Sequence, residues 1–146
     1  MSSYLAEILA LTFTGFAAVY PLLLWLTPHT LIDGGFYRFN QGMVSIVGTL
    51  GVVFFYLSDI GQAPWTVGAI WIVIQLIVTA IYWKSKRINN FVTSIPSILG
   101  ISFLVVMNVA LIPYNINIIN HLITIIGHTV LAAVFFAMIL GHWYLN

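Results

Sequence analysis

The residues best suited to chemistry in this sequence are histidines, and three of the four lie in its last apolar segment, at positions 121, 128 and 142. On a helix that advances about 100° per residue, His121 and His142 fall within about 40° of His128, as do Asn117 and Thr124. These side chains therefore form one polar stripe. Because an unpaired polar group in hydrocarbon costs several kcal/mol, we expect the stripe to face protein, water or a cofactor.

Neutral imidazole is a good axial ligand of haem iron. His128 and His142 are separated by about 21 Å along a helix, which is the spacing of two b-type haems stacked across a bilayer. Both histidines are therefore candidate haem-iron ligands, and His29 could complete the site at His142. The site at His128 would need a ligand from another subunit, for example from its own copy in a parallel homodimer.

Structural hydrogen bonding is the alternative role of the same imidazoles. Polar residues inside helical bundles often bond neighbouring helices, with a gain of about 0.6 to 2 kcal/mol each. A quinone, a pigment or a proton pathway would also use such a stripe, and His142, next to Trp143, also suits a membrane interface. Other segments offer hydrogen-bond partners for His128, namely Ser45, Thr49, Gln75, Thr79 and Asn108.

Composition identifies the medium that surrounds the chain. Of its 146 residues, 62% are apolar and 5% are charged, and the mean hydropathy is +1.09. An ordinary soluble domain is about 25% charged, so soluble enzymes and nucleic-acid-binding proteins are excluded. The chain also has no cysteine, which excludes disulfides, thiol catalysis and cysteine-ligated metals.

Turn and helix-breaking residues divide the chain into five apolar segments. A membrane helix needs about 20 apolar residues. The sequence therefore predicts an all-α, polytopic integral membrane protein with one domain over residues 1–146, a bundle of about five transmembrane helices. The predicted spans are residues 4–26, 41–57, 64–83, 90–112 and 117–145. Glycines at 48 and 51 are expected to be close contacts between helices.

The positive charges predict the orientation. Arg38, Lys84, Lys86 and Arg87 all fall on one side of a five-span arrangement. The positive-inside rule places that side, with the C-terminus, in the cytoplasm and the N-terminus outside. We expect a multi-pass protein of a bacterial, archaeal or organellar inner membrane.

The last segment also carries small residues opposite its polar stripe. Ala133, Ala137 and Gly141 follow one another at four-residue spacing, and such residues let a neighbouring backbone approach closely. We therefore expect this helix to pack on both sides, either at the centre of the bundle or at a subunit interface.

Function follows from what the chain lacks as well as from its stripe. Without a soluble domain or a full catalytic set, a stand-alone enzyme is not expected. The leading hypothesis is a small subunit of a larger membrane complex in respiratory or photosynthetic electron transfer. It would stabilise partner subunits among lipids, without nucleic acid, and help bind a b-type haem or a quinone. The alternatives are a self-contained channel or carrier with a polar path along the last helix, and a scaffold subunit without cofactor.

Overall fold

A computed structural model describes residues 3–27, 32–58, 65–85, 89–111 and 117–145. Each of its five α-helices is long and apolar enough to cross a membrane. The predicted all-α bundle is therefore confirmed, and the chain is built as a multi-pass membrane protein. The elements are α1 (Ser3–Leu23), a short 3₁₀ turn η1 (Leu24–Leu26), α2 (Gly34–Tyr56), α3 (Trp65–Trp83), α4 (Asn90–Leu111) and α5 (Ile118–Leu145).

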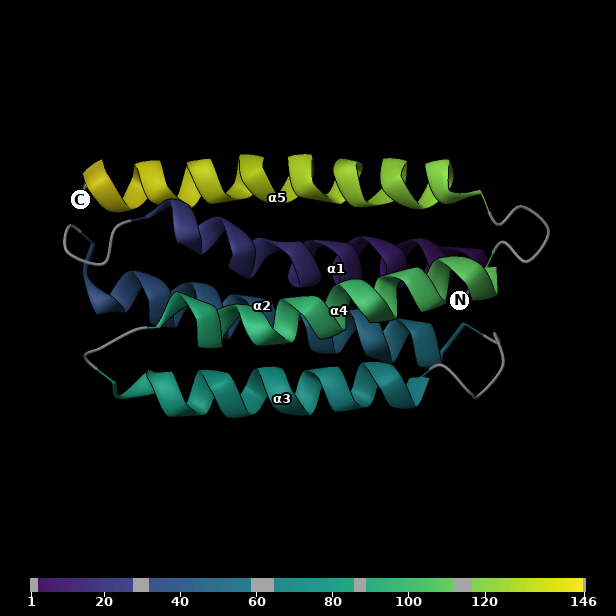
Figure 1. The fold of residues 1–146 in the computed structure, drawn as a ribbon, viewed down its shortest axis with the longest axis horizontal. Coiled ribbons are helices and arrows are strands. Elements are labelled where there is room, and N and C mark those ends of the chain that lie inside the picture. The colour runs from purple at the N-terminus through teal and green to yellow at the C-terminus, as the bar shows by residue number, and fades with distance from the viewer. Residues whose placement is uncertain (1–2, 28–31, 59–64, 86–88, 112–116, 146) are drawn as a thin grey trace.

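Helix α1 is the centre of the arrangement, since it packs against α2, α4 and α5. Helix α3 packs against α2 and α4 on the side of the bundle away from α5 (Figure 1). The two ends of the chain lie at opposite ends of the bundle. This up-and-down order fits short connections between antiparallel neighbours.

Polar side chains begin several of these helices. The Asp33 carboxylate accepts a hydrogen bond from the Gly35 amide at 3.2 Å and caps α2. The side-chain oxygens of Asn89 and Asn117 accept from amides two residues ahead, at 3.0 and 3.1 Å, and begin α4 and α5 in the same way. Because Asp33 is a cap, α2 begins at Gly34, well before the predicted start near Gln41.

Glycine brings α1 and α2 into close contact. A Cβ atom on Gly51 would lie 2.8 Å from the backbone nitrogen of Thr14, and one on Gly48 would lie 3.3 Å from the Cβ of Ala17. Side chains at these positions would push the two helices apart. The prediction that both glycines are close helix contacts is confirmed.

The core is centred on Trp71 of α3, which is 1% exposed. Its indole fills a space beside two glycines, because a Cβ would lie 3.2 Å from the ring at Gly48 and 2.7 Å from it at Gly100. Phe103 of α4 packs on the same ring, with centroids 6.1 Å apart. One large side chain thus ties α3 to α2 and α4.

Helix α5 lies at the edge of the bundle. Only 11% of its most apolar stretch is buried, against 56% for α1. The expectation that α5 occupies the centre of the bundle is wrong for this chain, because its single packed face follows α1. Ala132 and Phe136 on that face are buried.

Candidate functional site

His128 occupies the contact between α5 and α1. A methyl group on Gly15 of α1 would overlap the imidazole ring, so the ring lies directly on the α1 backbone. Its Nδ1 atom is 2.7 Å from the carbonyl oxygen of Thr124. A carbonyl oxygen can only accept, so Nδ1 carries a proton, and in the neutral imidazole Nε2 then has the lone pair.

The hydroxyl groups near His128 bond to their own helix. Thr124 donates to the carbonyl of Asn120 at 2.9 Å, and Thr129 donates to that of Ile125 at 2.8 Å. Neither bond links α5 to a neighbouring helix.

The other members of the stripe are spread along the helix. His142 is exposed near the end of α5, where the adjacent Trp143 packs on Phe36 of α2 with ring centroids 5.7 Å apart. Asn117 caps α5. His29 and the side chain of His121 lie outside the described residues.

The polar residues of α2 and α3 bond to each other instead of to His128. The side-chain amide of Gln75 donates to that of Gln41 at 2.8 Å, and the hydroxyls of Ser45 and Thr79 are 2.9 Å apart. Helix α3, which carries Gln75 and Thr79, lies on the side of the bundle away from α5 (Figure 1), and Gln41 and Ser45 bond to these two residues instead of to His128.

Two further residues expected as partners of His128 also bond within their own helices. Thr49 donates to the carbonyl of Ser45 at 2.7 Å, and Asn108 donates to that of Leu104 at 2.9 Å. None of the five expected partners therefore forms a described hydrogen bond with His128.

The donor set at His128 does not by itself make a metal centre. Within the described part of the chain, no three histidine, aspartate or glutamate side chains gather closely enough to hold a metal ion. The rise of the helix separates His128 from His142 by about 21 Å, so they cannot share one iron. A haem at His128 would need its second ligand from outside these residues, and Nε2 would have to leave its place against Gly15.

An apolar groove of about 320 Å³ lies where α1, α2 and α5 meet, and its lining begins on α5 at Leu131, about one helical turn from His128. Phe16 and Phe135 pack edge to face across it, with centroids 5.5 Å apart. The groove is near the middle of all three helices, at the depth of acyl chains. Its lining side chains are Thr12, Phe13, Phe16, Met43, Val47, Leu131 and Phe135.

The sequence does not predict this groove. Its lining comes from three helices, and hydropathy does not indicate which helices pack against one another. On a helix, Leu131 and Phe135 fall within about 60° of His128, so periodicity indicates only which side of the last helix takes part in the groove. No family model, curated protein or solved structure matches the chain.

Proposed function

We propose that this chain is a small integral-membrane subunit of a larger membrane complex and that it docks to a partner subunit through α5. The observation that carries this proposal is the open small-residue face of α5. Ala137 and Gly141 are exposed, and a Cβ atom on Gly141 or Gly127 would meet nothing within 4 Å.

Glycines of the other membrane helices allow a neighbouring helix to approach closely. Those at positions 15, 48, 51, 68 and 100 all lie against a side chain or backbone of a neighbouring helix. Among the described glycines of the membrane helices, Gly127 and Gly141 lack such a contact, as does Gly34 at the first position of α2. Glycine in a helix interior costs about 0.5 to 1 kcal/mol relative to alanine, so a partner helix would give Gly127 and Gly141 the role that the others have.

Co-purification from native membranes tests the docking surface. A tagged chain in mild detergent should retain a defined set of membrane partners. Ala137→Leu with Gly141→Leu should release them, because two isobutyl groups would fill the face that the partner backbone approaches. Ala80→Leu is the matched control, since Ala80 is an exposed alanine of α3. Recovery of the unsubstituted chain alone, or retention of partners by the double variant, would contradict the proposal.

We further propose that the complex carries out membrane electron transfer of the respiratory or photosynthetic kind. The support is the His128 tautomer, because a lone pair on Nε2 with Nδ1–H held by a carbonyl is what an iron ligand or a quinol acceptor needs. The groove one helical turn away fits a hydrocarbon chain, such as the isoprenoid tail of a quinone. Binding at Nε2 requires the ring to rotate away from Gly15, so this role ranks second to docking.

A visible spectrum and a quinone extraction of the partner-bound preparation test the electron-transfer role. A b-type haem would give a Soret band that shifts on reduction, and His128→Ala should abolish it or lower the quinone content. Thr129→Val is the control, because that adjacent hydroxyl bonds only within α5 among the described contacts. A colourless, quinone-free complex would instead identify a scaffold subunit.

A self-contained channel or carrier has less support. The hydroxyls of Thr124 and Thr129 are engaged within α5, and the groove beside them is apolar. A polar path along α5 would need these groups to face a shared aqueous space. Transport activity of the purified chain alone in liposomes would favour this alternative.

For orientation, we propose that the end of the bundle with Arg38, Lys84 and the C-terminus is cytoplasmic. The remaining cations of the sequence, at positions 86 and 87, belong to the same connection as Lys84. The positive-inside rule supports this assignment.

A further inference from the structure

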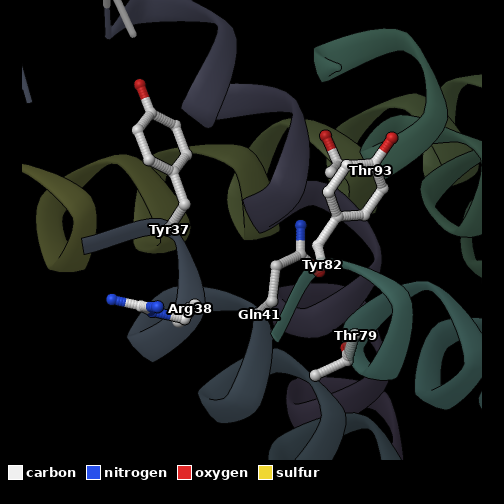
Figure 2. A pocket seen from close by; sticks show the side chains of 6 residues that line it. All are labelled: Tyr37, Arg38, Gln41, Thr79, Tyr82 and Thr93. Atoms are coloured by element: carbon white, nitrogen blue, oxygen red, sulfur yellow. The ribbon is translucent and has the colours of Figure 1, made fainter. Parts of the chain in front are cut away.

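A small pocket lined by residues with polar side chains lies away from α5, between α2, α3 and α4, toward the Arg38 end of the bundle. Figure 2 shows the side chains around it. They are Tyr37, Arg38, Gln41, Thr79, Tyr82 and Thr93. None of the roles proposed above uses this pocket.

Gln41 has an unsatisfied group directed into the pocket. The residue is 2% exposed, and its side-chain oxygen accepts from Gln75. Its Nε2 atom has no hydrogen-bond partner among the described residues, and it points toward Tyr82 and Thr93 (Figure 2). A buried donor left unpaired costs about 1 to 3 kcal/mol, so this position calls for an acceptor.

This requirement does not depend on how the two amides are assigned. The bond between Gln41 and Gln75 uses one polar group of each side chain. Reversing both amides would direct an acceptor instead of a donor into the pocket, because the two groups exchange places. A ligand that both donates and accepts would satisfy either arrangement.

Two more unpaired polar atoms lie at the same depth. Trp71 of α3 packs against Gly100 of the antiparallel α4, and Gln75 and Ser97 each lie about one helical turn from that contact, toward the Arg38 end. Gln75 Oε1 and Ser97 Oγ are buried without a described hydrogen-bond partner. Three of the six such atoms among the described residues therefore lie at one level of α2, α3 and α4, and the others belong to Thr14, Trp71 and Asn90.

The size of the pocket decides what it can bind. It offers about 10 Å³ to the centre of a water molecule, which is room for about one water. A hydrated ion, a lipid headgroup or a quinone ring is too large. The Arg38 side chain extends away from Gln41 (Figure 2), so the pocket is not arranged to bind an anion either.

We propose that this pocket binds one buried water molecule that links α2 to α4. The water accepts from Gln41 Nε2 and donates to Thr93 Oγ1, whose own proton goes to the Asn90 carbonyl at 2.9 Å. Phe55 of α2 and Phe103 of α4 pack edge to face with ring centroids 5.5 Å apart, so a bridging water adds a polar link to an apolar contact between the two helices.

Water-to-protein polarisation transfer in solid-state NMR tests this site on the full chain in lipid bilayers. The side-chain amide of Gln41 should receive polarisation from water several-fold faster than that of Asn40. Asn40 is the matched control because it is also buried, while its amide donates to the Phe36 carbonyl and its oxygen accepts from Tyr20. Equal, slow transfer at both amides would overturn the proposal.

A variant adds a second test. Thr93→Ile removes the hydroxyl and fills the pocket, so transfer to Gln41 should fall to the rate at Asn40. Thr49→Ile serves as the control outside the pocket and should leave the transfer unchanged. If Thr93→Ile folds and Gln41 still receives polarisation at the original rate, the water lies elsewhere. Should that variant fail to fold, the comparison of Gln41 with Asn40 in the unsubstituted chain remains decisive.

Discussion

At the scale of single residues, the contact between His128 and Gly15 determines how α5 is held. An imidazole can lie against a helix backbone only where the facing residue has no side chain, and Gly15 meets that condition. The Thr124 carbonyl fixes the ring from the other side. The contact is therefore specific in shape even though it includes no hydrogen bond between the helices.

We expect Gly15→Ala to destabilise the chain by about 1 to 3 kcal/mol, because the added methyl group overpacks the contact with the ring. In a His128→Ala background the same substitution should cost much less, since the ring is gone. Thermal unfolding in detergent of the four variants of this double-mutant cycle measures the coupling. Equal costs in both backgrounds would show that the ring does not lie on Gly15.

The partner of His128 could not be predicted from the sequence for a related reason. Helical periodicity indicated that His128 faces protein, water or a cofactor, and in the structure its ring lies against Gly15 of α1. Amides and hydroxyls are the side chains that a sequence offers as partners of an imidazole, whereas the residue that meets the ring is a glycine with no polar side chain. Gln75 and Thr79 attracted attention as polar residues, but the order of helices in space directs them to α2.

At the scale of helices, length and apolar content were sufficient to predict five spans, because a bilayer imposes the same requirement on each. The start of α2 was missed because Asp33 and the two glycines after it are typical of a turn, while Asp33 in fact caps the helix. The peripheral place of α5 was missed because an apolar helix has the same composition whether lipid or protein surrounds it.

For the helices, a buried and an exposed glycine predict opposite changes in stability when each is replaced by alanine. Gly51→Ala should destabilise the bundle by about 1 to 3 kcal/mol, since the new Cβ would meet the backbone of Thr14. Gly127→Ala should be neutral or stabilise the isolated chain by up to about 1 kcal/mol, because it has open space around it and alanine favours helix. Unfolding in detergent distinguishes the two, and a loss of stability from Gly127→Ala in the pure monomer would reveal an internal contact there.

At the scale of the whole molecule, α1 to α4 form a packed unit, and α5 is attached to its edge mainly through α1, with Phe36 of α2 packing on Phe136 and Trp143. The unit contains its own tryptophan-centred core and the hydrogen bonds between α2 and α3. Helix α5 contributes one packed face and leaves the rest exposed. This asymmetry is what a subunit needs if four helices maintain its fold and the fifth meets a partner.

Because the chain has five candidate membrane spans, one pair of variants can test its orientation. Asn89 and Asn117 are exposed caps that accept from an amide two residues ahead, and they lie at opposite ends of the bundle because α4 separates them. The chain has no cysteine, so Asn89→Cys and Asn117→Cys each introduce a single thiol at a similar cost in capping. In intact cells, a membrane-impermeant maleimide should label Cys at position 117 and leave position 89 unlabelled until the membrane is opened.

Arg38 and Lys84 lie at the same end as Asn89, so the reverse pattern would place the cationic end outside and contradict the positive-inside assignment. Labelling of both positions, or of neither, would mean that α4 does not cross the bilayer, and the arrangement of five spans would then have to be revised.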